Sequence, residues 1–300
     1  MRSHRSQPGD LDSTHDGRNR AAVDSALRWF RKYGRIFRVS LIERLHYRGD
    51  FFFSTILRFL PMLTTILLWR AVYIGAAESG RRDLAGFRYE EMVAYLLLVN
   101  ISRMFSSMPG LAGGMARDIR DGSLKKYLLQ PLDMVSYLLA YRVAHKTAYI
   151  VTSFLPYAAL FASCWSFFDT FPDGATGWLA YAASLILAFV IGFHFEACVG
   201  MVGFWLLEVS SLLYVIMTLN YFLSGHMFPL DLLPPAWVAV LRALPTQYLA
   251  YFPAAVFLGK IRGDDLAWGL AVGVAWAVGL MLLSRGLYKI GLRRYSAFGG

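Results

Sequence analysis

Charged residues are scarce in this 300-residue chain: Asp, Glu, Lys and Arg make up 17% of it, against about a quarter in a typical soluble domain. The deficit is concentrated in several nearly uncharged runs of about 20 residues, the length that a helix needs to cross a bilayer core of about 30 Å. Hydrophobic residues reach 57% of the chain. This composition excludes an ordinary soluble domain and predicts an all-α membrane protein.

Several motifs are also missing. The two cysteines, Cys164 and Cys198, lie apart inside apolar runs, which excludes a disulfide framework and a cysteine-based zinc site. The phosphate-binding pattern Gly-x-x-x-x-Gly-Lys-Ser/Thr does not occur, nor does His-Glu-x-x-His or Gly-x-Ser-x-Gly. We therefore expect no catalytic residue, no metal and no cofactor in this chain. A net charge of +10 without a soluble basic module does not indicate nucleic-acid binding.

The N-terminal region is polar and basic, and it predicts no cleavable signal peptide. Residues 1–23 have almost no large apolar side chains and are expected to form a disordered cytoplasmic tail. Over residues 24–48, aromatic and aliphatic residues recur at helical spacing among several arginines. Such a pattern is typical of an amphipathic helix that lies in the headgroup plane on the anionic face of a membrane.

The remaining residues, 49–300, are expected to form a single six-helix transmembrane domain. The predicted crossings are 51–77, 91–114, 136–167, 178–207, 209–225 and 266–284.

The distribution of Lys and Arg predicts the orientation of these crossings. The first 50 residues contain eleven of them, the 115–135 connection four and the final segment 285–300 four, whereas the 168–177 connection has none. Cytoplasmic connections carry the excess of basic residues. Both termini and the 115–135 connection are therefore expected to be cytoplasmic, in a multi-pass protein of the cell (inner) membrane.

Two further segments differ from ordinary loops. The region after Gly225 is rich in proline yet apolar, and it predicts a re-entrant pair of short helices on the outer side. The charged stretch 116–137 predicts a short helix that Ser123 caps and Pro131 ends, with its leucines exposed on a common side. Exposed leucines with a charged rim suit a groove on a partner protein. Contact with lipid alone is the alternative.

These two segments carry a family resemblance. "GSLKKYLLQPL" follows the second crossing, "FLSGHMFPLDLLPPAW" and "LPTQYLAYFPAAVFLG" follow the fifth, and "RRYSAFGG" closes the chain. With six crossings and an N-terminal interfacial (elbow) helix, the chain resembles the permease subunits of ABC-2 type exporters, in the short bacterial branch without a fused ATPase.

The resemblance implies a permease that pairs with a second permease, identical or related, and engages two ATP-binding subunits, which bind ATP and Mg. It implies ATP-driven export of an unidentified amphipathic, hydrophobic or lipid-like solute by alternating access. The residues expected to couple to the ATPase are Gly122, Ser123, Leu124, Leu128, Leu129 and Pro131. The outer re-entrant motif is expected at Ser224, Gly225, Pro229, Pro245, Pro253 and Gly259.

Ionisable residues inside apolar runs are candidates for function because their burial is costly. The candidates are Glu196, His194 and Arg58. Two residues apart on a helix, His194 and Glu196 project about 200° from each other, so they are not expected to share a ligand. Glu196 is expected to pair with Arg58 or Arg103; contact with substrate or a position at the dimer axis is the alternative.

Three basic residues at the start of the third crossing, Arg142, His145 and Lys146, are expected to reach the cytoplasmic headgroups. An entrance for an anionic substrate is the alternative.

Two other function classes are alternatives for this sequence. One is an intramembrane enzyme that acts on a lipid-like substrate through His194, Glu196 or His226. The other is an ion-coupled secondary transporter, which the sequence disfavours because only one broken segment is apparent, after the fifth crossing.

Overall fold

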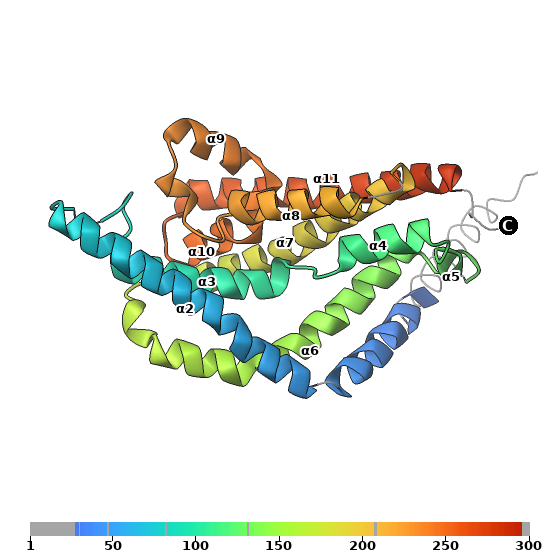
Figure 1. Cartoon of the computed structure of the whole chain (residues 1–300), viewed down its shortest axis with the longest axis horizontal. Coiled ribbons are helices and arrows are strands. Elements are labelled where there is room, and N and C mark those ends of the chain that lie inside the picture. The colour runs from blue at the N-terminus through green and yellow to red at the C-terminus, as the bar shows by residue number, and fades with distance from the viewer. Residues whose placement is uncertain are drawn as a thin grey trace, which may run out of the picture.

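The computed structural model describes residues 28–29, 31–46, 48–81, 83–130, 132–206 and 209–295, without the side chains at 48, 50–52 and 58. In these ranges the structure is helical and contains no strand (Figure 1). Residues 31–46 are helical, and the predicted tail at 1–23 lies outside the described residues. The helices that follow are α2 (Arg48–Glu78), α3 (Tyr89–Ser106), α4 (Leu111–Arg120), α5 (Lys125–Leu128), α6 (Met134–Ser163), α7 (Gly174–Met201), α8 (Ser210–Leu223), α9 (Pro235–Ala243), α10 (Tyr251–Phe257) and α11 (Gly263–Arg294).

The long helices fall where the apolar runs predicted them, with one difference: the run at 91–114 is divided between α3 and α4. By length and composition, three of the described helices are able to cross a membrane, namely Phe53–Glu78, Gly174–Phe204 and Gly263–Arg294. Helix α8 is apolar but shorter.

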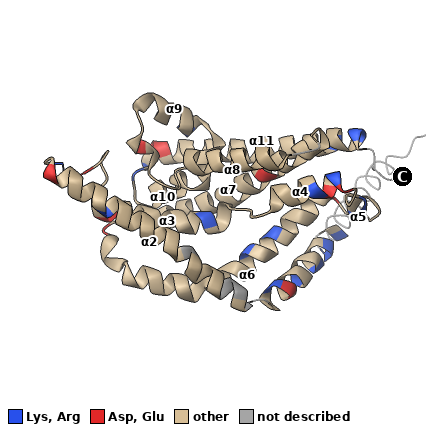
Figure 2. Ribbon diagram, viewed as in Figure 1, with Lys and Arg blue, Asp and Glu red and all other residues tan. Residues whose placement is uncertain are grey.

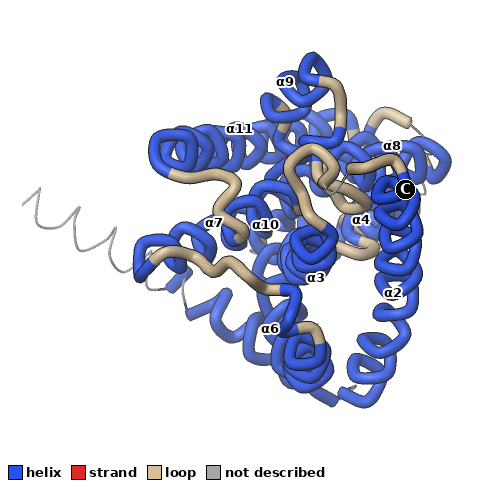
Figure 3. The backbone as a smooth tube through the Cα atoms, turned by 90° about the vertical axis from the view of Figure 1, so that its left-hand side faces the viewer, coloured by secondary structure: helices blue, strands red, loops and turns tan. Residues whose placement is uncertain are grey.

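Helix α7 is the centre of the fold. It packs against α11, α4, α3 and α10, whereas α2 and α6 pack against each other and reach the rest chiefly through α3. Figures 1 and 3 show the α2–α6 pair standing to one side of the layer that contains α3, α7 and α11. The largest buried cluster joins α3, α7 and α10, and it includes the fully buried rings of Tyr95, Tyr248 and Tyr251.

Two glycines allow α7 to touch its neighbours through the main chain. A Cβ atom added at Gly192 would collide with the carbonyl group of Ser106 at the end of α3. At Gly200 it would lie 2.8 Å from the carbonyl oxygen of Ala112 in α4. Since a side chain at either position would force the helices apart, these glycines set how closely α3 and α4 approach α7.

The predicted pair of short helices after α8 is present as α9 and α10, joined by the 3₁₀ turn Pro245–Leu249. Every residue of α10 is buried. By contrast, α9 buries only Leu241 and exposes Trp237 and Val240. A three-residue cluster holds the two together, because the Tyr251 hydroxyl and the Arg242 guanidinium both donate to Asp231, at 2.8 and 2.7 Å.

Charge is distributed unevenly along the molecule. Figure 2 shows Lys and Arg around α4, α5, the end of α11 and the N-terminal helix. At the basic end, Lys126 pairs with Asp118 (2.7 Å) and Arg120 with Asp121 (3.1 Å). At the opposite end, where α9 and α10 lie, four basic side chains are paired with acids. These ion pairs are Arg88–Asp169 (2.8 Å), Arg242–Asp231 (2.7 Å), Lys260–Glu91 (3.0 Å) and Arg262–Asp173 (3.1 Å).

Candidate functional site

A break in the predicted second crossing is the central feature of the site. Helix α3 ends at Ser106 and α4 begins at Leu111; between them Ser107 is extended and Gly110 is left-handed, with φ of 74°. Pro109 has no N–H to continue a helix, and glycine takes positive φ without steric cost. The sequence prediction of an uninterrupted crossing is therefore wrong here. The dipeptide Pro109–Gly110 was a turn signal that the apolar surroundings concealed.

Two cations of α6 satisfy the carbonyl groups that this break exposes. The Lys146 ammonium donates to the carbonyl oxygens of Met104 and Ser107, both at 2.5 Å, and the Arg142 guanidinium donates to that of Pro109 at 3.0 Å. The end of a helix carries partial negative charge and unpaired carbonyl groups, so cations stabilise it. Arg142 and Lys146 are 9% and 6% exposed. The prediction that they extend to the headgroups is therefore wrong.

Glu196 of α7 lies on the opposite side of the same break and binds a main-chain N–H there. Its carboxylate accepts a hydrogen bond from the Met108 N–H at 3.1 Å. In the part of the chain that the structure describes, Glu196 forms no ion pair, so the predicted pairing with Arg103 is wrong; the side chain of Arg58 lies outside the description. The three charged residues are thus arranged around one main-chain break.

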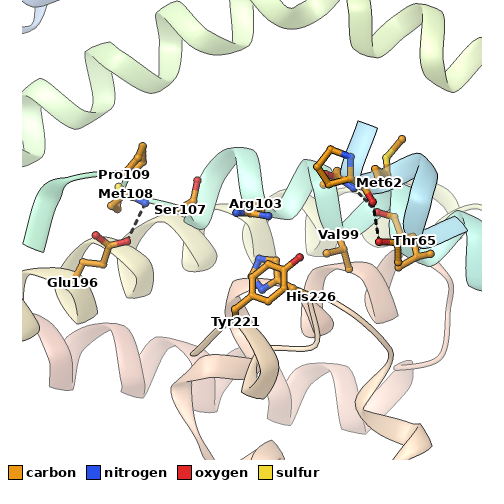
Figure 4. Close-up of a pocket in the computed structure, with 13 residues that line it drawn as sticks. Met62, Thr65, Val99, Arg103, Ser107, Met108, Pro109, Glu196, Tyr221 and His226 are labelled. Atoms are coloured by element: carbon orange, nitrogen blue, oxygen red, sulfur yellow. Dashed lines mark hydrogen bonds between the residues drawn. The ribbon is translucent and has the colours of Figure 1, made fainter. Parts of the chain in front are cut away.

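A cavity of about 380 Å³ opens beside the break (Figure 4). Its polar part contains Arg103, Glu196 and His226, and its apolar part includes Met62 and Val99; the other lining residues are Pro61, Thr65, Leu96, Asn100, Ser107, Met108, Pro109 and Tyr221. A site of this kind suits a ligand with both polar and apolar groups.

The two histidine candidates are held differently. The His226 ring stacks on Tyr221, with centroids 5.0 Å apart, and its Nδ1 lies 2.5 Å from the Ser224 hydroxyl. The Arg103 guanidinium covers the same tyrosine ring at 5.1 Å. His194 instead bonds Ser284 of α11 at 2.9 Å and does not line the cavity. The predicted separation of His194 from Glu196 is therefore confirmed.

Replacement of Lys146 by methionine tests whether the cation supports the break. It leaves two buried carbonyl groups without their donor, and each unsatisfied group costs about 1–3 kcal/mol. We expect a clear fall in the thermal-inactivation midpoint of the purified chain. Thr147→Val is the matched control, since Thr147 is the next residue, is half-buried and forms its side-chain hydrogen bond within its own helix, to the Val143 carbonyl. Equal midpoints for the two variants would contradict the role of Lys146.

The segment predicted to couple to an ATPase, residues 122–131, is called the coupling segment below. It leaves the end of α4 at Gly122 and contains the four-residue helix α5. The prediction that its leucines are exposed on a common side is wrong. Leu124 is fully buried, whereas Leu128 and Leu129 are 49% and 83% exposed. The predicted capping role of Ser123 is also wrong, since Leu124 precedes α5 and no side chain caps it. Pro131 lies outside the described residues.

Leu124 and Tyr127 fix the coupling segment to the body of the protein. Both belong to a buried cluster that also contains Met134 of α6, Phe193 of α7 and Tyr288 of α11. Burial and the neighbouring Asp118 raise the pKa of Tyr127 far above its usual value, so its hydroxyl stays neutral. The segment therefore presents Leu128 and Leu129 from a rigid base.

The predicted outer motif forms the turn that ends α8. The helix stops at Leu223, and Gly225 follows with φ of 82°. The Tyr95 hydroxyl donates to the Gly225 carbonyl at 2.6 Å, and the Tyr251 N–H donates to the Ser224 carbonyl at 3.0 Å. Pro229 precedes the 3₁₀ turn Leu230–Leu232, Pro245 begins the turn before α10, Pro253 lies inside α10, and Gly259 follows it with φ of 66°. Tyr95 links the turn to α3, and no sequence pattern indicated this contact.

Comparison with known proteins gives the family. Residues 59–299 match the family described as "ABC-2 family transporter protein", which covers most of the chain. The comparison with curated proteins found no match. The matched range includes the α3–α4 break, residues 122–131 and the turn at Gly225. The chain belongs to the ABC-2 transporter family.

Proposed function

We propose that this chain is the membrane-spanning permease subunit of an ATP-driven exporter, with ATP and Mg bound by two separate ATP-binding subunits. Beyond family membership, the proposal rests on one observation: Leu128 and Leu129 are exposed on a charged segment that buried residues anchor to the protein. Apolar anchors surrounded by polar residues are typical of a protein interface. Gly122 and the buried Leu124 would hold these anchors in place, and Ser123 and Pro131 belong to the same segment.

The proposed arrangement has six crossings: α2, the α3–α4 pair, α6, α7, α8 and α11. Helix 31–46 would lie in the cytoplasmic headgroup plane of the inner membrane. The charge distribution supports this orientation, since the basic end of the molecule would be cytoplasmic, and acids neutralise basic residues at the end assigned to the outside. A second permease, identical or related, would complete the transmembrane pathway.

The cavity beside the α3–α4 break supports an amphipathic solute. Its lining combines Arg103, Glu196 and His226 with several apolar side chains, and α4 connects it directly to the coupling segment. Movement of the coupling segment by the ATPase would thus reach the cavity through one helix. An intramembrane enzyme remains a second candidate only because His226 also faces this cavity.

Co-expression of the chain with the ATP-binding subunits encoded in the same genome tests the proposal. The full chain should retain one of them through purification, and the purified chain alone should turn over no lipid-like substrate. Turnover by the chain alone that is lost in His226→Ala would favour the enzyme instead.

Reporter fusions test the proposed topology. A fusion after Gly300 should be active only as a cytoplasmic reporter, and an insertion at Gly174, where α7 begins, only as an external one. The physical reason is the excess of Lys and Arg on the connections assigned to the cytoplasm. An external C-terminus would rule out the six-crossing arrangement.

A further inference from the structure

A basic groove lies between the N-terminal helix and the segment that follows α5. It has a volume of about 440 Å³ and is lined by Arg28, Arg31, Lys32, Arg35, Ile36 and Leu132. Among the described residues that line it, four are cationic and none is acidic. Figure 2 shows the same concentration of basic residues along this helix.

The spacing of these cations concentrates positive charge on one side of the helix. Residues three and four apart are neighbours on a helix surface, and like charges at this spacing destabilise it. Arg28, Arg31 and Arg35 are exposed, and no carboxylate of the described residues pairs with them. A bound anion would relieve this repulsion and accept several charge-assisted hydrogen bonds from the guanidinium groups.

The apolar surroundings indicate what carries the anion. Ile36 and Leu132 form part of the groove, and the same helix exposes Trp29, Val39 and Ile42. A basic helix with exposed apolar side chains is typical of a membrane interface, where phosphate groups and acyl chains are adjacent. An acidic protein segment would satisfy the charge but would not account for these apolar side chains.

We propose that this basic groove binds the phosphate group of an anionic membrane lipid. The proposal rests on the membrane position of the helix given in the proposed function. Leu132 lies three residues after the exposed Leu129, so the bound lipid would connect the N-terminal helix with the end of the coupling segment. The lipid would thereby hold that end of the segment at the membrane surface.

Native mass spectrometry of the purified full chain tests this, with phosphatidylglycerol and phosphatidylcholine as probes. A basic residue near an anionic surface contributes about fivefold to binding, so Arg31→Gln and Arg35→Gln should each lower phosphatidylglycerol affinity by about that factor. The matched control is Arg38→Gln, an exposed arginine of the same helix that does not line the groove. It should leave the affinity close to wild type, and Arg31→Lys should retain most of the binding.

The outcomes separate the possible occupants. Equal losses for Arg31→Gln, Arg35→Gln and Arg38→Gln would indicate diffuse surface attraction and overturn the site. Binding of inorganic phosphate without phosphatidylglycerol would assign the groove to a free anion. If the groove variants kept the lipid but lost the co-purified ATP-binding subunit, the occupant would be an acidic segment of that partner. Recovery of the ATP-binding subunit by the wild-type chain reports on the permease function separately, because it does not depend on any groove variant.

Discussion

Leu129→Asp is expected to remove the ATP-binding subunit from the purified complex and to abolish export, while the chain still inserts into the membrane. Leu129 is 83% exposed and Leu128 beside it is 49% exposed, so neither is needed to pack the protein itself. Buried anchors at an interface typically contribute about 2 kcal/mol or more, which is roughly a thirtyfold loss of affinity. Recovery of the ATPase by co-purification measures the effect.

Lys125→Ala is the matched control for this prediction, since Lys125 is exposed on the same segment and forms no ion pair with a described residue. Exposed charges contribute about 0–1 kcal/mol, so its effect on ATPase recovery should be small. If the segment only touched lipid, the lysine variant would show the larger loss, because basic residues near an anionic surface contribute about 1 kcal/mol each. Leu124→Asp is unsuitable as a test, because it would disrupt the buried cluster.

Gly225→Leu is expected to abolish export without preventing insertion. The residue has φ of 82°, and a Cβ atom there would lie 2.8 Å from the Tyr95 hydroxyl and 2.9 Å from the Tyr251 Cβ. The left-handed conformation alone costs about 1–2 kcal/mol for a non-glycine residue, and the collision would displace the turn from α3 and α10. Export by membrane vesicles that contain the ATPase partner is the measurement.

Gly279→Leu is the control for Gly225→Leu. Gly279 lies inside α11, where nothing approaches within 4 Å of an added Cβ atom and φ is ordinary. It should insert and export like the wild type. Undiminished export by Gly225→Leu would show that the turn does not need its present geometry.

The sequence predicted the helices better than it predicted their contacts. Apolar periodicity and charge placement identified every long helix, and the proline-rich region after Gly225 correctly indicated short helices, because these features act locally. The pattern at 91–114 did not show its interruption. The break depends on Lys146 and Glu196, which approach it from α6 and α7, and single-sequence patterns carry little information about such distant partners.

Burial within the coupling segment was the other failure. Leu124, Leu128 and Leu129 are equivalent as residue types, and only the position of Phe193 and Tyr288 decides that the first is buried. The missed break also bears on the secondary-transporter alternative. The absence of a broken helix in the first half was a reason against a secondary transporter, and that reason no longer holds; family membership now decides the question.

The close approach at Gly192 and Gly200 has a mechanical consequence. Helices packed through side-chain ridges resist sliding, because each step must lift one ridge over the next. Along the seam between α7 and the α3–α4 pair, main-chain atoms meet at these two glycines, so the side-chain ridge of α7 is interrupted there. Small sliding of packed helices is how shear motions proceed. The seam that runs from the cavity toward the coupling segment is therefore suited to small sliding of α7 past α3 and α4, and larger residues at Gly192 or Gly200 should hinder that movement.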